Sequence, residues 1–121
     1  MADDPMTLSS VTSVTIRDGL VKVSGLAAGP ADYNATVGAV MDLSAYVSTV
    51  PGGVQFGGCT AVADALIYPT WIGASSANVA DGKVVFTWDS DSAADAVFEE
   101  VADQTNLSGY VWHFTVFGEP A

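Results

Sequence analysis

The chain has very few of the side chains that most catalytic and nucleic-acid-binding sites require. Its 121 residues include one histidine, His113, one cysteine, Cys59, and three basic residues, Arg17, Lys22 and Lys83. General acid–base chemistry usually draws on histidine, lysine or a carboxylate tuned by a nearby cation. Contacts to phosphate and nucleic acid need arginine and lysine. We therefore expect no enzyme activity, no cofactor and no nucleic-acid partner.

Other features are also scarce. A single cysteine excludes a disulfide within the chain, and Cys59 is interpreted as structural because a reactive thiol needs a base close by. No apolar run approaches the roughly 18 residues that span a bilayer, so we expect no membrane partner. Residues 1–5 contain no basic region and no long apolar region, which predicts no secretory signal.

What the chain does have is apolar residues and negative charge. Half of its residues are hydrophobic, 14 are aspartate or glutamate, and the formal net charge is −11. This composition fills one core of ordinary size and leaves an apolar surplus, which we expect to be buried between subunits. The charge favours docking on a neutral or locally basic surface.

The pattern of short strands and turns predicts an all-β fold. Residues 1–10 are interpreted as a flexible N-terminal arm, and residues 11–121 as a single β domain. Strands at regular spacing, separated by Gly and Asp turns, favour a compact antiparallel β-sandwich or a jelly-roll-like barrel. One or two short helical turns are expected, the clearest over residues 42–46 with Asp42 or Ser44 as its cap.

Two Asp-Gly pairs predict hairpins. The first, at Asp18-Gly19, pairs Ile16 with Val21 and implies that alternate residues share one buried face. The members of this face are Val14, Ile16, Val21 and Val23. The second hairpin turns at Asp81-Gly82. It sets Val79 opposite Val84 and Ala77 opposite Phe86.

The closing segment, residues 109–118, is the strongest strand candidate because it is apolar on both of its faces. Trp112 and Phe114 share one face, while His113 and Phe117 share the other. A strand of this kind is central in its sheet and covered on both sides. We expect the second sheet to cover one face and a neighbouring subunit to cover the other.

An acidic run over residues 89–100 matches part of the calcium-loop pattern. Four carboxylates occupy ligand positions of that pattern: Asp89, Asp91, Asp95 and Glu100. Ala93 and Ala94 stand where a ligand and the turn glycine are required. The run is therefore interpreted as a solvated loop, with a weak, irregular cation site as the alternative. Adjacent Glu99 and Glu100 point to opposite faces of a strand, so they do not form a glycosidase pair.

From residue 33 onward the chain resembles small virion proteins that decorate or cement the capsids of tailed bacteriophages. The matching stretches are short: residues 36–38 leading into 41–44, the Pro51-Gly52-Gly53 turn, and residues 82–86, 99–102 and 107–108 before the closing strand. The resemblance implies a compact β domain without cofactor. It would form small oligomers, with a trimer favoured, on the outside of an icosahedral shell.

The resemblance also implies the partners and the location. They are the major capsid protein, further copies of the chain, and the capsid exterior of a virion assembled in the host cytoplasm. We expect the capsid or subunit contacts to come from the arm, two loops and the closing strand: Met6, Leu8, Val11, Tyr33, Trp71, His113 and Phe117. The alternative is a carbohydrate- or receptor-binding β-sandwich module of a phage tail or bacterial surface, with Trp71 as the exposed aromatic candidate for stacking on sugar.

Overall fold

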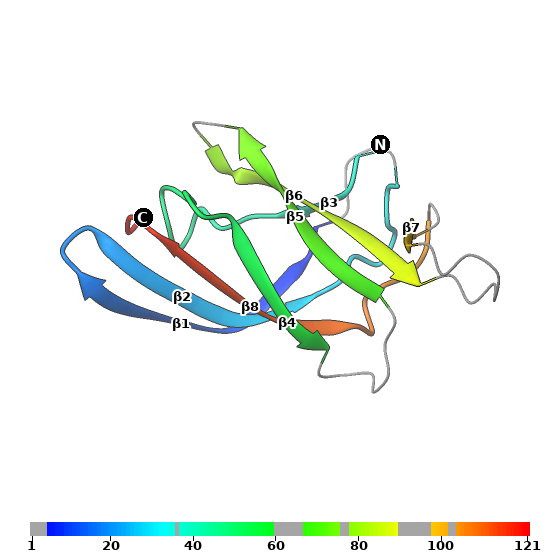
Figure 1. The fold of residues 1–121 in the computed structure, drawn as a ribbon, viewed down its shortest axis with the longest axis horizontal. Coiled ribbons are helices and arrows are strands. Elements are labelled where there is room, and N and C mark those ends of the chain that lie inside the picture. The colour runs from blue at the N-terminus through cyan, green and yellow to red at the C-terminus, as the bar shows by residue number, and fades with distance from the viewer. Residues whose placement is uncertain (1–4, 36, 60–66, 76–77, 90–97, 102–103) are drawn as a thin grey trace.

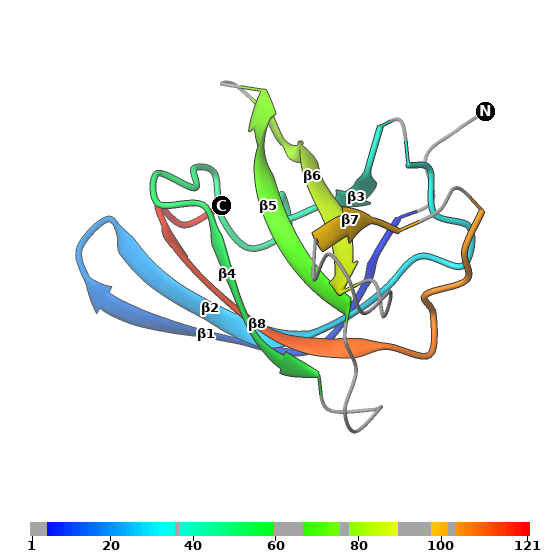
Figure 2. The same ribbon diagram turned by 45° about the vertical axis from the view of Figure 1, so that its right-hand side comes forward.

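The computed structural model is a β-sandwich of two antiparallel sheets, shown in Figures 1 and 2. It describes residues 5–35, 37–59, 67–75, 78–89, 98–101 and 104–121. The first sheet has the strand order β1-β2-β8-β4, formed by β1 (Thr7–Arg17), β2 (Leu20–Ala28), β8 (Val111–Gly118) and β4 (Val54–Cys59). The all-β class and the sandwich predicted from the strand pattern are confirmed.

The second sheet has the order β3-β6-β5, and β7 also pairs with β6. Its strands are β3 (Ala39–Met41), β5 (Ile67–Ser75), β6 (Asn78–Asp89) and β7 (Phe98–Glu100). Pro69 lies in β5, an edge strand, where its missing N–H leaves no ladder hydrogen bond to a further strand unmade. The described residues contain no helix. The expected helical turn is a hydrogen-bonded turn in which Asp42 accepts from the Ser44 amide at 2.9 Å.

The core lies between the sheets and is built mainly from alternate residues of the central strands. The rings of Tyr33 and Phe86 meet edge to face at 5.4 Å, and those of Phe86 and Trp112 lie 5.1 Å apart. Trp112 and Phe114 of β8 are almost completely buried. Strand β8 is therefore central, as predicted, and its inner face is covered by the second sheet.

The first hairpin forms where it was predicted, but its register is different. Arg17 pairs with Leu20 around the Asp18-Gly19 turn, and Gly19 takes a φ of +77°, a conformation that suits glycine. Beyond the turn, a bulge at Ile16 shifts the pairing, so that Val14 lies opposite Lys22 rather than Val23. The prediction of four residues on one buried face is thus wrong.

The bulge has a physical explanation in the position of the strand. β1 is the edge strand of its sheet, and bulges are common at edges because no further strand has to follow the kink. The result is that Val21 and Val23 are buried whereas Val14 and Ile16 are 55% and 52% exposed.

The second predicted hairpin is also wrong, because Asp81 and Gly82 lie inside the continuous strand β6. Strands β5 and β6 pair with Ser75 opposite Asn78, and Val84 lies opposite Trp71. Gly82 is needed there for close approach rather than for a turn. A Cβ at this position would lie 2.6 Å from the Met41 carbonyl oxygen and would clash with the Trp71 ring.

Residues 5–10 belong to the folded domain, which corrects the prediction of an arm without a core face. The Met6 amide donates to the Val40 carbonyl at 2.8 Å, and the Met6 side chain is 6% exposed. Pro5 forms a parallel bridge with Val40, and β1 begins at Thr7. From Pro5 onward the chain therefore lies first against the edge of one sheet and then forms the edge strand of the other.

Candidate interaction surface

Two of the predicted contact residues are buried and therefore do not form a surface. Met6 packs in the core, and Tyr33 is fully buried. The Tyr33 hydroxyl donates to the Glu100 carboxylate at 2.7 Å and accepts from the Phe86 amide at 3.1 Å. Burial, together with the hydrogen bond to Glu100, raises the pKa of Tyr33 well above its ordinary value. The polar tip of Tyr33 thus joins three segments of the chain.

Three further predicted contact residues are partly buried. Leu8 and Val11 of β1 and Trp71 of β5 pack against the core. The Trp71 ring lies against Gly82 and Gly53, which have no side chain to displace it. Trp71 is therefore held by packing and is only partly exposed.

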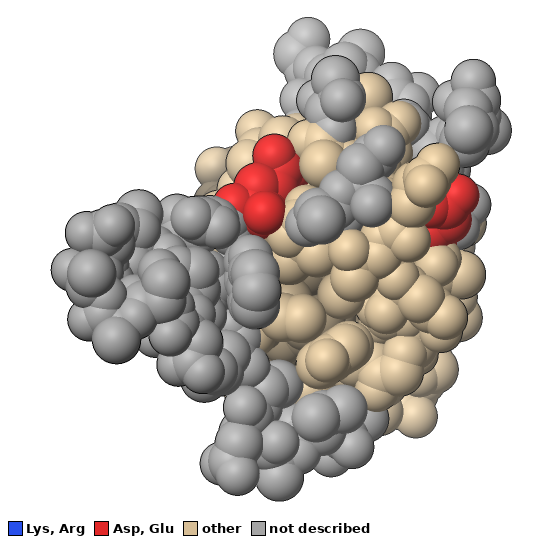
Figure 3. Space-filling view, turned by 90° about the vertical axis from the view of Figure 1, so that its right-hand side faces the viewer, with Lys and Arg blue, Asp and Glu red and all other residues tan. Residues whose placement is uncertain are grey.

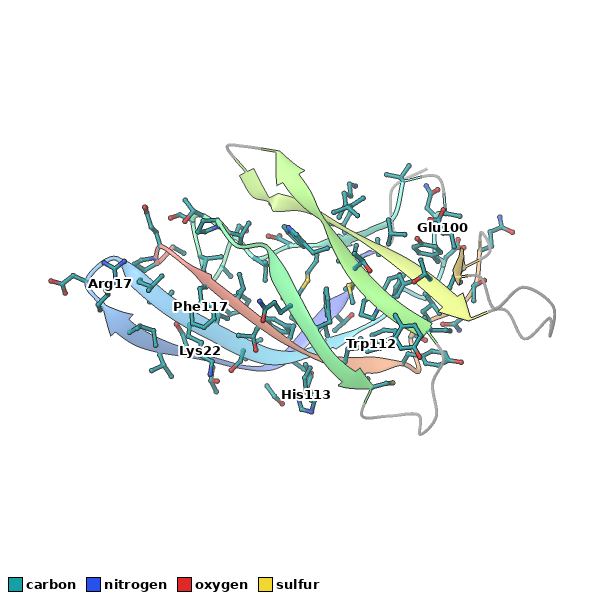
Figure 4. The ribbon with its side chains drawn as sticks, in the orientation of Figure 1. Arg17, Lys22, Glu100, Trp112, His113 and Phe117 are labelled. Carbon is teal, nitrogen blue, oxygen red and sulfur yellow. The ribbon has the colours of Figure 1, made fainter. Side chains whose placement is uncertain are left out.

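The remaining two, His113 and Phe117, share the outer face of β8 and are exposed. Figure 4 shows them along the lower side of the four-stranded sheet, whereas Trp112 points between the sheets. In the structure of the single chain this outer face is not covered by any described residue of the second sheet. The expectation that a neighbouring subunit covers it stays a prediction.

The outer face is organised in rows that run across the strands. Nearest the β1–β2 turn, Val14 pairs with Lys22, and Lys22 pairs with Phe117. The next outward row is entirely polar and crosses all four strands: Thr12, Ser24, Thr115 and Gln55. After it, Leu26 pairs with His113. Apolar and basic residues thus lie at the turn end, and hydroxyl groups lie in the middle of the sheet.

A shallow groove of about 340 Å³ follows the polar part of this face. Its lining includes Thr12, Ser24, Leu26, His113 and Thr115. Ser10, also in its wall, has a φ of +52° at the bulge between Ser9 and Thr12. Phe114 also lies in its wall but is almost completely buried, and neither Tyr nor Trp lines the groove.

Sequence reasoning missed Val14 and Ile16 as surface residues. Alternation placed both in the core, and the bulge that reverses their side has no signature in the sequence. The one available signal was charge, because Arg17 and Lys22 lie five residues apart in a chain with three basic residues in total.

The acidic run falls largely outside the described residues, as do Asp91 and Asp95. Glu100 is described, and it accepts the hydrogen bond from Tyr33. Within the described ranges, no three His, Cys, Asp or Glu side chains lie close enough together to hold a metal ion. Cys59 is a half-buried free thiol opposite Trp112. No helix among the described residues has the length and apolar character needed to cross a membrane.

Comparison with known proteins gives no relative: no protein-family model, curated protein or solved structure matches the chain.

Proposed function

We propose that this chain is a structural protein of a tailed-phage virion that binds the outer surface of the assembled capsid and stabilises it. It would bridge neighbouring capsomers as a small homo-oligomer, with a trimer favoured, and it would use no cofactor. Its partners would be the major capsid protein and further copies of itself, on the capsid exterior of a particle assembled in the host cytoplasm.

The observation that supports this proposal is the uncovered outer face of the four-stranded sheet. Sandwich domains bury the inner face of each sheet, and an outer face that also carries large apolar side chains is typical of an interaction surface. Here Phe117 is 43% exposed on β8, a central strand of the sheet. On the same outer face of β8, Thr115 separates Phe117 from His113. Such a face suits a protein that acts by binding.

The stabilising effect would follow from linkage. A protein that binds only the expanded lattice lowers the free energy of that lattice relative to every state that lacks the binding site. Many copies on one shell add avidity, so each single contact can be weak. The negative charge of the chain favours a neutral or locally basic docking surface on the capsid.

The N-terminal segment enters the proposal differently from the sequence-based expectation. An arm that orders only on docking would be removable without harm to the fold. Because Met6 is buried and residues 7–10 form part of β1, deletion of residues 2–10 is expected to destabilise the domain itself. The contact surface is therefore assigned to the outer face and not to an arm.

Sedimentation with purified capsids tests the proposal. Capsids of the phage that encodes the chain are prepared in compact and expanded forms, mixed with the chain, and pelleted. We expect saturable binding to the expanded form, loss of binding for His113→Glu on the outer face, and retained binding for Ile72→Asp on the other sheet. If the same amount of the chain is found in the pellet with and without capsids, the proposal is contradicted.

The alternative, a carbohydrate- or receptor-binding module, has less support. Its candidate aromatic, Trp71, packs against Gly82 and Gly53, and the groove on the outer face has neither tyrosine nor tryptophan in its lining. Binding to a glycan array by the wild-type chain, with no binding to capsids, would favour this alternative.

A further inference from the structure

One end of the outer face combines exposed apolar groups with positive charge. We call it the hairpin-end patch and define it as Val14, Ile16, Arg17, Lys22 and Phe117. In the row Val14–Lys22–Phe117 the lysine lies between two apolar side chains that are 55% and 43% exposed. A lysine in such a position covers its neighbours with its methylene groups and keeps the ammonium group in water. Figure 4 shows Arg17, Lys22 and Phe117 grouped at this end of the sheet.

The patch exists because of the bulge at Ile16. In a regular hairpin, Val14 would lie opposite Val23 and face the core. The bulge places Val14 opposite Lys22 instead, and Ile16 itself is 52% exposed. The edge strand β1 thus presents Val14 and Ile16 to solvent, and Phe117 of β8 is exposed on the same face of the sheet. Contiguous exposed apolar groups with charged neighbours are typical of protein–protein contacts.

The charges of the patch differ in sign from those of the rest of the chain. Arg17 and Lys22 are two of the three basic residues, and the only carboxylate in the adjoining turn is Asp18. These three residues sum to +1, so the remaining residues of the chain sum to −12, since the total is −11. Among the described residues, neither Arg17 nor Lys22 forms an ion pair within the chain.

The opposite end of the molecule carries described carboxylates and no visible basic side chain among the described residues. Figure 3 views the molecule from the end that lies far from Arg17 in Figure 4, where Glu100 is located. Carboxylates gather there in two places, and no lysine or arginine is visible among the described residues. Two copies that approach through such acidic surfaces repel each other, whereas the hairpin-end patch of one copy attracts an acidic surface of the other.

We propose that the hairpin-end patch is the surface on which a second copy of this chain docks, through a carboxylate-bearing surface of that copy. Val14, Ile16 and Phe117 would supply the apolar part of the contact on either side of Lys22, and Arg17 and Lys22 would pair with carboxylates of the other copy. Because the two surfaces in contact are different, the interface is heterologous, and it closes into a ring when the rotation between copies permits.

This inference rests on the self-association named in the proposed function, but not on the capsid. It also predicts how the association depends on salt. The ion pairs that Arg17 and Lys22 would form with the other copy are screened at high ionic strength. The dissociation constant of self-association is therefore expected to rise with salt. A contact between two identical apolar surfaces would instead be unaffected or strengthened by salt.

The test is sedimentation equilibrium of the purified chain without capsids, over a wide concentration range and at two salt concentrations. Two matched pairs of variants locate the contact. Ile16→Asp is compared with Ile72→Asp, because both are isoleucines next to a register shift in an edge strand, with 52% and 57% exposure. Lys22→Gln is compared with Thr70→Glu, since each lowers the net charge by one unit at an exposed strand position.

We expect the wild-type chain to associate, and Ile16→Asp and Lys22→Gln each to raise the dissociation constant by about tenfold or more, as loss of a central or charge-paired contact does. The two control variants are expected to stay within about twofold of wild type. A monomer at every concentration, equal effects of patch and control variants, or association strengthened by salt would each overturn the inference. If the wild-type chain does not associate with itself but still binds capsids, this inference is overturned and the capsid-binding part of the proposed function stays in place.

Discussion

The two faces of the four-stranded sheet are made from the same strands but have opposite roles. On the inner face, Val23 of β2 pairs with Val116 of β8, and both are fully buried. One residue away on each strand, Lys22 pairs with Phe117 on the outer face, and both are exposed. The alternation of the β-strand separates a row that stabilises the fold from a row that is free to bind.

The comparison teaches that apolar character alone does not distinguish the two faces. Phe114 and Phe117 are both phenylalanines of β8, yet one is 1% and the other 43% exposed. What separates them is the second sheet, which covers only the inner face. Substitutions on the two faces should therefore differ in what they change, and the following predictions use that difference.

The largest effect is expected for Phe114→Ala. Removing a fully buried phenylalanine leaves a cavity and costs about 3–5 kcal/mol of the free energy of unfolding. The matched variant Phe117→Ala on the outer face should cost about 1 kcal/mol or less. Urea titrations of both variants measure the difference, and similar losses of stability would contradict the assignment of the two faces.

The next largest effect is expected for Tyr33→Phe. This change removes one oxygen atom and leaves both the Phe86 amide and the Glu100 carboxylate without the partner that they have in the wild-type chain. Because a buried group that loses its partner is costly, we expect a loss of about 1–3 kcal/mol. Tyr46→Phe, at a half-exposed position, is the control and should change the unfolding free energy by less than about 0.5 kcal/mol.

The same tyrosine predicts a dependence on alkaline pH. The pKa of Tyr33 is raised in the folded chain, so above about pH 10 the unfolded chain loses this proton while the folded chain keeps it. The contribution of the protonated Tyr33 hydroxyl to the free energy of unfolding is complete below about pH 10 and declines as the pH rises further. The free energy of unfolding should fall more steeply with pH in wild type than in Tyr33→Phe, and identical slopes would show that the hydroxyl is not protected by burial.

The smallest effect is expected at Val14 in the edge strand β1, which is compared with Val23 in the core. Val14→Thr should change the free energy of unfolding by no more than about 0.5 kcal/mol, because Val14 faces outward beyond the bulge. Val23→Thr introduces a hydroxyl group into the core and should cost about 1–3 kcal/mol. Equal costs would mean that Val14 faces inward and that the regular hairpin register is the correct one.

The sequence predicted features that depend on local patterns. Alternation in residues 109–118 identified the central strand, and the Asp18-Gly19 pair identified the first turn. These signals are local because a strand period and a two-residue turn are set by residues next to one another.

Other features were wrong because they depend on residues far apart in the chain. Asp81-Gly82 has the sequence of a turn, yet Gly82 lies within β6, where the Trp71 ring and the Met41 carbonyl leave no space for a side chain. The bulge at Ile16 depends on β1 being an edge strand, which only the sheet order reveals. Tyr33 was expected on a surface loop, but its partners Phe86 and Glu100 place it in the core.

The central claim is that the outer face, at its hairpin end, is the contact surface between copies. Hydroxyl-radical footprinting of the purified chain over a concentration series tests it most directly, because it reports the accessibility of single side chains. Phe117 of the patch should lose reactivity as the concentration rises, while Tyr68, which is 45% exposed on the other sheet, should keep it. A Phe117 reactivity that stays constant at every concentration, or that falls together with the reactivity of Tyr68, would contradict the claim.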